Sequence, residues 1–460
     1  MSLYTQLTAL IPIIFSYLPH ILFTVILLYV INFYISYINR ENPLPGPIPL
    51  PMIGNIHQMW RDAPKFYTEM HERYGDVFEF YLINKRIIML SRVDLAEKML
   101  TQSVKSNYFI RITSTSQGWE ELGLTKGLAG TKERHLWLLY RKVFKQCITS
   151  TKYMKETVHA TQKLFSEVEE YWKELGDSAS LEFTKWLHHL SVDTQVRILT
   201  GQQTYALSTY FNSLLPPHLK KSLPQSSIQS YSKFTSHLVS FVEVLKYFAV
   251  VPPFFRHYVP GFRQTAERMK RENDTNMIKS SEFERQLTEE ETAQLLVETF
   301  LAGIDTTTNA LCFTIYYICK YPAVKAHLLS EIDATLSSEG HSLSYDSIVT
   351  LFPYTSAVMK EAARVLPVVP IVLIIASEDD EIAGHKWRAG TAFGINHIGI
   401  HKHTAYWKDP ETFRPERFLE DEINPKTFLP FGGTFEVELC EPDKEIEYAH
   451  HMATQCSGLK

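Results

Sequence analysis

Apolar residues recur every three or four positions along most of the chain, the spacing that places them on one face of a helix. The sequence predicts helices wherever this spacing holds: over 132–148, 152–174, 181–200, 228–249, 289–319, 323–337 and 353–366. Apolar and β-branched residues alternate over 74–91, which predicts a β-hairpin that turns at Asn84 and Lys85. Short strands and turns are expected over 369–398. The pattern therefore predicts a mainly α fold with a small β portion.

The N-terminal segment differs from the rest of the chain because residues 1–39 contain no Lys, Arg, Asp or Glu. At about 1.5 Å per residue, the apolar run 21–38 is long enough to cross most of a bilayer. A cleaved signal peptide is the competing interpretation, but the sequence has neither a positive n-region nor a small-residue cleavage site. Residues 1–39 are therefore interpreted as a single-pass membrane anchor. Basic residues begin at Arg40, which by the positive-inside rule places the remainder in the cytosol.

Residues 40–51 follow the anchor and contain the run NPLPGPIPLP. Closely spaced prolines forbid a continuous helix and stiffen the chain, so this segment is expected to be a hinge that sets the angle of the following domain. An ordinary linker is the alternative, since Pro-rich spacers are common.

The composition narrows the possible partners and the compartment. The 460 residues are 45% hydrophobic and 21% charged, enough for one large domain or two to three small ones. A formal net charge of −5 without a long basic run argues against nucleic acid as a partner. A reducing compartment is expected because no CxxC pair occurs among the five scattered cysteines, Cys147, Cys312, Cys319, Cys440 and Cys456.

The predicted helix 289–319 carries a polar interruption, LAGIDTTTNAL. Ala302 and Gly303 are small, so a bulky group can approach the helix, and Asp305 and Thr306 place a carboxylate and a hydroxyl at the same point. Thr and Gly are poor helix formers, and a Thr hydroxyl can bond the carbonyl one turn back. The pattern favours proton handling, and a helix interior that tolerates its threonines is the alternative.

A second constellation is KEAARVLPVVP, in which Glu361 and Arg364 lie three residues apart and hence on one helix face. The apolar residues after them suggest that this face is covered, and a buried Glu and Arg must satisfy each other or find a third partner. Arg417, in FRPERF, is a plausible third partner. The alternative is a solvent-exposed ion pair, which is common for an isolated ExxR.

Together the motifs resemble, in order and separation, the haem-thiolate monooxygenases of the cytochrome P-450 family. The resemblance covers nearly the whole chain up to Gly433. Each motif is weak and the ordered set is specific: the anchor, LPGP in the hinge, WLLYR (137–141), AGIDTT (302–307), EAAR (361–364), FRPERF (413–418) and FLPFGG (428–433).

The resemblance implies residues that bind haem b. Trp137 and Arg141 would contact a haem propionate, with the guanidinium supplying charge-assisted hydrogen bonds. Ala302 and Gly303 would lie against the cofactor. Phe431 would introduce the loop that carries the cysteine ligand of the iron, whose thiolate favours cleavage of the O–O bond.

The resemblance also implies catalytic and structural roles. Asp305 and Thr306 would help to protonate dioxygen. Glu361, Arg364 and Arg417 would form the family's buried structural triad behind the haem.

The reaction implied by the resemblance is insertion of one oxygen atom from O2 into an apolar small-molecule substrate. Electrons would come from NADPH through a partner reductase. The chain would be anchored in the membrane of the endoplasmic reticulum, with a catalytic domain of residues 52–433 in the cytosol. Residues 247–262 resemble the family's substrate-entry region, although a surface loop over the core is an equal interpretation.

The segment after Gly433 departs from the family pattern, which places the cysteine seven residues after the phenylalanine of FGG. That position is Glu438, and Cys440, the candidate iron ligand, comes two residues later. Nearby carboxylates should raise the pKa of its thiol: Glu436, Glu438, Glu441, Asp443, Glu445 and Glu447. Residues 434–460 are interpreted as a divergent acidic tail that replaces the expected cysteine loop and the following helix.

Ile374 is a smaller departure, at a position where relatives often carry a propionate-binding arginine. Three functions stay open from the sequence. The chain is a working monooxygenase, a catalytically inactive truncated or mis-spliced family member, or a non-enzymatic membrane-tethered binding protein that keeps the scaffold and its apolar pocket.

Overall fold

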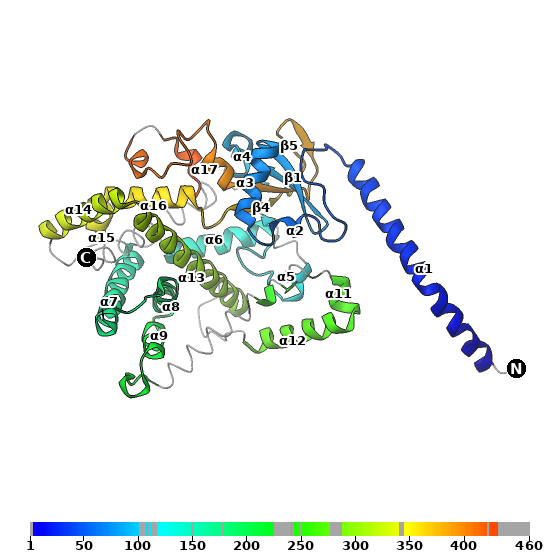
Figure 1. Cartoon of the computed structure of the whole chain (residues 1–460), viewed down its shortest axis with the longest axis horizontal. Coiled ribbons are helices and arrows are strands. Elements are labelled where there is room, and N and C mark those ends of the chain that lie inside the picture. The colour runs from blue at the N-terminus through cyan, green and yellow to red at the C-terminus, as the bar shows by residue number, and fades with distance from the viewer. Residues whose placement is uncertain are drawn as a thin grey trace.

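The computed structural model describes residues 3–100, 107–108, 110–111, 117–148, 151–176, 178–224, 241, 243–245, 247–248, 251, 253–276, 288–339, 345–420 and 423–430. Most of this part is helical (Figure 1). The helices are α1 Leu3–Ile38, α2 Ile56–Met59, α3 Ala63–Tyr74, α4 Val93–Leu100, α5 Gln117–Glu121, α6 Arg134–Ile148, α7 Thr151–Leu175, α8 Phe183–Thr200, α9 Ala206–Leu214, α11 Pro253–Tyr258, α12 Pro260–Asn276, α13 Glu289–Lys320, α14 Pro322–Glu339, α15 Tyr345–Leu351, α16 Pro353–Val365 and α17 His397–Lys402.

The strands form a small β portion beside the helices. They are β1 Val77–Leu82, β2 Lys85–Leu90, β3 Ile110–Arg111, β4 Ile371–Ile375, β5 Asp380–Ile382, β6 His385–Trp387 and β7 Ala392–Asn396. One sheet has the order β1-β2-β7-β4-β3, with β2 and β7 parallel and the other neighbours antiparallel. Its strand β4 buries Ile374, which pairs with Arg111 of β3. The predicted mainly α fold with a small β portion is confirmed.

Six of the seven helices predicted from periodicity match observed helices within a few residues, and the seventh, 228–249, lies mainly outside the described residues. Other helices, such as α3, α9 and α12, were not predicted. The hairpin prediction was wrong by one residue. Leu82 and Lys85 are paired across the ladder, so the turn consists of Ile83 and Asn84. Ile83 adopts a φ of 59°, a left-handed conformation that the apolar alternation does not reveal.

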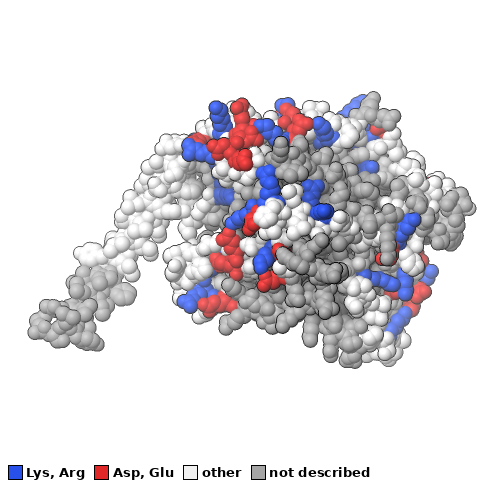
Figure 2. All heavy atoms as spheres, turned by 180° about the vertical axis from the view of Figure 1, so that it is seen from behind, with Lys and Arg blue, Asp and Glu red and all other residues white. Residues whose placement is uncertain are grey.

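The N-terminal helix α1 extends away from the body of the molecule (Figure 1). Its segment Tyr17–Ile38 has a mean hydropathy of 2.2 and is long and apolar enough to cross a membrane. Figure 2 shows this segment without acidic or basic side chains, in contrast to the charged surface of the body.

The chain that follows α1 is fixed to the sheet by Glu79 of β1, whose side chain is buried. Arg40 Nε lies 2.5 Å from Glu79 Oε1, and Arg86 Nε donates to Glu79 Oε2 at 2.8 Å. The Leu44 N–H also donates to this carboxylate, at 3.2 Å. Removal of one partner from such a buried ion pair is costly, so these contacts hold the start of the hinge at a defined place.

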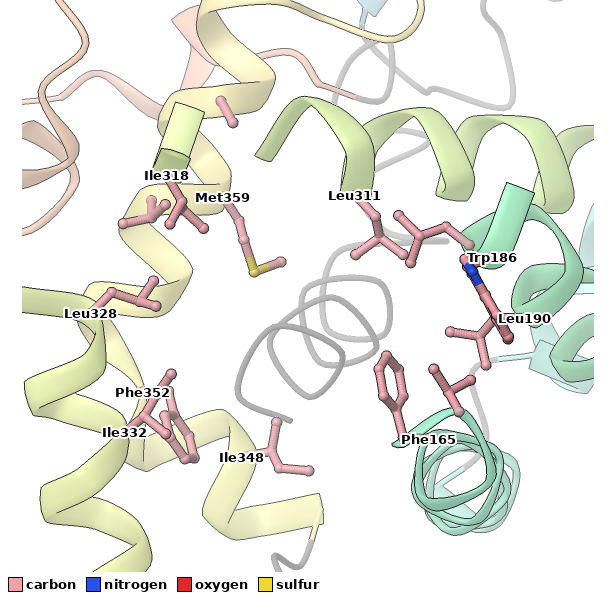
Figure 3. Close-up of a cluster of buried hydrophobic side chains, with 14 of the residues drawn as sticks. Phe165, Trp186, Leu190, Leu311, Ile318, Leu328, Ile332, Ile348, Phe352 and Met359 are labelled. Atoms are coloured by element: carbon pink, nitrogen blue, oxygen red, sulfur yellow. The ribbon is translucent and has the colours of Figure 1, made fainter. Parts of the chain in front are cut away.

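The main apolar core lies among the long helices. Side chains from α7, α8, α13, α14 and α16 point toward a common centre (Figure 3), among them Phe165, Trp186, Leu311, Leu328 and Met359. Burial of large apolar side chains of this kind is the main source of stability. It holds α13 in the middle of the molecule, next to α8 and α16 (Figure 1).

Candidate active site

The long helix α13 forms the centre of the candidate site. It begins with a capping box, in which Thr288 Oγ1 accepts a hydrogen bond from the Glu291 N–H at 3.2 Å and Glu291 Oε2 accepts one from the Thr288 N–H at 2.5 Å. The helix continues through the polar stretch 301–311 without a break. Thr306 and Thr308 hydroxyls each donate to the carbonyl four residues earlier. These bonds satisfy the hydroxyl groups that the helix interior would otherwise leave unpaired.

One face of α13 is open although the helix lies in the middle of the molecule. Ala302, Asp305 and Asn309 are exposed, and their spacing of three and four residues places them in one strip. Thr306 is half-buried at the edge of this strip, and its Oγ1 donates to the Ala302 carbonyl. The strip therefore combines a small residue, a carboxylate and a hydroxyl, as the polar interruption predicted.

Asp305 has a titratable partner on α8. Its side chain is 64% exposed, and its Oδ1 lies 3.7 Å from His188 Nδ1. His188 is therefore the described ionisable side chain that lies beside this exposed carboxylate.

Gly303 lies on a different side of α13 from Ala302. It is buried, and a Cβ at this position would come within 2.8 Å of the Gln195 side-chain carbon Cδ on α8. The described neighbour of Gly303 is therefore helix α8, and the expected contact of Gly303 with a cofactor stays a prediction. The sequence indicated a close approach, but it could not indicate the partner.

Trp137 and Arg141 lie together on α6, both half-buried. The guanidinium carbon of Arg141 is 5.4 Å from the centroid of the Trp137 ring, a cation–π distance. Between them in sequence, Tyr140 is fully buried, and its hydroxyl donates to Glu291 Oε1 at 2.8 Å. This bond ties α6 to α13, and burial raises the pKa of the Tyr140 phenol, so the hydroxyl keeps its proton.

Glu361, Arg364 and Arg417 meet in the interior, where each side chain is at most 3% exposed. Arg364 Nε lies 2.7 Å from Glu361 Oε2, and Arg417 Nε lies 3.1 Å from Glu361 Oε1. Arg364 also donates to the His401 carbonyl at 2.9 Å, and Arg417 to the Lys408 carbonyl at 2.8 Å. The cluster thus connects α16 with the backbone of two later segments, which a solvent-exposed ion pair would not do.

The described chain ends at Pro430, beside this cluster. The N–H of Leu429 donates to His401 Nε2 at 2.8 Å, and the rings of Phe428 and His401 stack at 5.6 Å. Burial lowers the pKa of His401 well below its usual range, with His397 and Arg364 adding to the effect, so the ring is neutral and can accept this bond. His401 therefore fixes the start of the loop that leads to the FGG motif.

A mainly apolar cleft lies between this loop and the two central helices. Its walls include Phe313 from α13, Met359 from α16, Leu366, Phe428 and Pro430. Phe431, Glu438 and Cys440 lie outside the described residues. Within the described ranges no three His, Cys, Asp or Glu side chains are grouped to hold a metal ion.

The described residues include the kinds of group that would hold an apolar cofactor with anionic edges. The cleft supplies apolar walls, α13 supplies an open face with a small residue, and Arg141 supplies a cation. Sequence reasoning missed His401 and His188, although the run HIGIH, with two His four apart on one helix face, was a usable signal.

This combination of a mainly helical fold, an acid and an alcohol on an open central helix, and an apolar cleft is that of a haem-dependent monooxygenase, an oxidoreductase. A comparison with protein families gives the same class, because the model of the family "Cytochrome P450" matches residues 44–433. The chain belongs to the cytochrome P450 family, which implies haem iron as its cofactor.

Individual relatives agree with this assignment. The chain is 24% identical over 440 residues to cytochrome P450 3A17 of Cavia porcellus, covering 89% of this chain and 84% of the relative. It is 26% identical over 419 residues to cytochrome P450 3A5 of Homo sapiens, covering 85% and 79%. A plant relative, the ferruginol synthase of Salvia miltiorrhiza, is 22% identical over 432 residues, covering 87% and 84%.

Proposed function

We propose that this chain inserts one oxygen atom from O2 into an apolar small molecule, with electrons that a reductase delivers from NADPH. The observation that carries the proposal is the open strip on α13, where Asp305, with His188 beside it, and Thr306 stand on one exposed helix face at the centre of the molecule. The apolar walls of the neighbouring cleft favour an apolar substrate over a charged one.

Each residue of the site would have its own role in the proposed reaction. Haem b, when bound, supplies the iron chemistry that activates dioxygen. Trp137 and Arg141 would hold its propionates, since a guanidinium donates two parallel bonds to a carboxylate. Thr306 Oγ1 holds a proton next to the Ala302 carbonyl, and the Asp305 carboxylate, exposed and beside His188, can replace that proton from solvent. Glu361, Arg364 and Arg417 would hold α16 and the segments around His401 and Lys408 together behind the site.

We propose the same domain organisation as the sequence suggests: an anchor of residues 1–39, a hinge of residues 40–51, and a catalytic domain of residues 52–433 on the cytosolic side of the endoplasmic reticulum. The apolar helix Tyr17–Ile38 and the buried contact between Arg40 and Glu79 support this arrangement. The contact fixes the first residue after the anchor to the sheet, so the catalytic domain would be held at a defined angle to the membrane.

For the iron ligand we propose Cys440, the nearest thiol after the FGG motif. The matched family range ends at Gly433, just before the acidic tail of residues 434–460. Carboxylates around a thiol disfavour the thiolate that must bind the iron. We therefore propose that the chain as it stands binds haem through a thiolate only poorly.

The test of the function is spectroscopic. The full chain is expressed in membranes with haem supplied, reduced and exposed to carbon monoxide, and the Soret band is recorded. A weak red-shifted band of a thiolate-ligated complex is expected, together with oxidation of NADPH when a reductase is added. Complete absence of haem would contradict the proposal, and saturable binding of apolar compounds by the haem-free chain would instead favour the membrane-tethered binding protein.

Thr306→Val is expected to separate NADPH consumption from product formation. The valine keeps the shape of the side chain but removes the proton on Oγ1, so reduced oxygen should leave as peroxide. We expect product per NADPH to fall by about tenfold or more, measured with an apolar alkyl ether that releases a fluorescent alcohol. Thr299→Val is the matched control, because the Thr299 hydroxyl bonds the Leu295 carbonyl on the same helix. Equal losses in both variants would show a general helix effect and overturn the role of Thr306.

A further inference from the structure

The loop between α5 and α6 lies directly on α13, upstream of the open strip. Within this loop, residues 124–131, the Thr131 N–H donates to the Gly127 carbonyl at 3.2 Å and closes a turn over 127–131. Gly127 and Gly130 are buried. A Cβ on Gly127 would collide with the Glu298 carboxylate of α13, and one on Gly130 would collide with the Leu124 carbonyl of the loop itself and come within 3.0 Å of Gln294 Nε2. Glycine at these two positions lets the loop fold tightly and lie close to α13.

Two side chains of α13 receive the N–H groups of this loop. Glu298 Oε2 accepts from Leu128 at 2.8 Å and from Ala129 at 3.4 Å, and Gln294 Oε1 accepts from Lys126 at 2.8 Å. Gln294 Nε2 donates to Glu298 Oε1 at 3.2 Å and so orients the carboxylate. The two side chains are four residues apart, on the helix face that also carries Ala302 and Asp305.

Burying the carboxyl group of Glu298 beneath the loop is energetically unfavourable for its charged form. Burial raises its pKa to about 7, although the bonds from Gln294, Ala129 and Leu128 partly lower it. Among the described ionisable residues nearby, Glu291 accepts a bond from Tyr140, and Lys126 pairs with Glu290. A buried carboxyl group is unfavourable unless it accepts hydrogen bonds. Because Glu298 accepts its bonds from main-chain N–H groups of the loop, these bonds hold the loop in place.

The loop leads directly into the helix that carries two proposed haem contacts. Helix α6 begins at Arg134, three residues after Thr131, and presents Trp137 and Arg141. Its residue Tyr140 is attached to Glu291, one turn before Gln294 on the same face of α13. The loop and α6 are therefore attached along a single line on α13.

We propose that Glu298, assisted by Gln294, is a positioning residue that fixes loop 124–131 on α13 and thereby sets where α6 presents Trp137 and Arg141 to the haem propionates. The last step rests on the proposed function. The attachment of the loop does not, because every bond in it lies within the protein.

Hydrogen exchange of the full-length chain in detergent tests the attachment without haem. In Glu298→Ala, exchange of the amides of Leu128 and Ala129 should become about tenfold faster or more, since both lose their acceptor. Exchange in Glu298→Gln should be intermediate. The oxygen of the introduced glutamine can still accept from the loop N–H groups, but its NH2 group is placed against the NH2 group of Gln294. The double variant Gln294→Glu with Glu298→Gln restores every donor and acceptor and should restore slow exchange. Glu290→Ala is the control, because it removes an exposed ion pair between the same helix and loop.

The consequence for haem is measured on the same variants as the rate of haem transfer to an apoprotein acceptor. We expect faster transfer from Glu298→Ala and recovery in the double variant. Unchanged exchange in Glu298→Ala, or no recovery in a double variant that keeps slow exchange in α8, would overturn the attachment. Altered exchange with unaltered haem transfer would overturn the positioning role. A chain that takes up no haem would contradict the proposed function, while the exchange result would still decide whether Glu298 holds the loop.

Discussion

Replacing Glu361 by alanine is expected to lower the free energy of unfolding by about 3–5 kcal/mol, the usual cost of removing one partner from a buried ion pair. The variant leaves two guanidinium groups in the interior without their carboxylate, since Arg364 and Arg417 are at most 3% exposed. It also removes the acceptor of the Arg414 N–H, which bonds Glu361 Oε1 at 2.8 Å. A loss of this size is a large fraction of the stability of an ordinary domain.

The measurement is the midpoint of urea denaturation of the full chain in detergent, followed by tryptophan fluorescence. Glu420→Ala is the matched control, because Glu420 forms an exposed ion pair with Arg414 at 3.2 Å in the same part of the chain. Exposed pairs of this kind contribute at most about 1 kcal/mol, so the midpoint should barely move. Similar shifts in the two variants would mean that the buried cluster contributes no more than a surface pair.

Only part of this buried cluster was predictable from the sequence. A spacing of three residues places Glu361 and Arg364 on one helix face whatever the fold, so their contact was predictable. The partner Arg417 was inferred from its motif rather than from any spacing. The carbonyl acceptors of His401 and Lys408 could not be predicted, because they depend on the path of backbone segments that carry no distinctive side chains.

The position of the polar interruption in α13 was predictable from the sequence, but the contacts of its residues were not. Periodicity identified the helix and composition identified the strip, and both depend only on local sequence. At Gly303 a small residue indicated a close neighbour without identifying it; the structure shows Gln195 there, and the expected cofactor contact stays a prediction. Glu298 was missed for a related reason. A Gln and a Glu four apart resemble an ordinary solvated face, and only the close approach of Gly127 turns them into an attachment site.

Moving the thiol into the family register should give the largest gain in haem–thiolate complex. The variant combines Glu436→Arg, Glu438→Cys and Cys440→Gly. It places a cysteine seven residues after Phe431, a cation two residues before it and a glycine two residues after it. The arginine favours the thiolate, whereas the native carboxylates at 436 and 438 disfavour a negative charge at Cys440. We expect the red-shifted Soret band of the reduced carbon monoxide complex to increase about tenfold or more over that of the unmodified chain, because thiolate ligation is lost when the thiol stays protonated.

Two controls separate the position of the thiol from its charge environment. Glu436→Arg alone leaves Cys440 in place, and should increase the band only slightly if the two-residue displacement is the main obstacle. Cys440→Ala in the unmodified chain should remove the weak band, because this cysteine is the proposed ligand. A strong band in the unmodified chain that Cys440→Ala abolishes would show that Cys440 binds the iron well from its own position, and would contradict the argument from register. A band of normal strength in Glu436→Arg alone would instead mean that charge, and not spacing, limits thiolate binding in this chain.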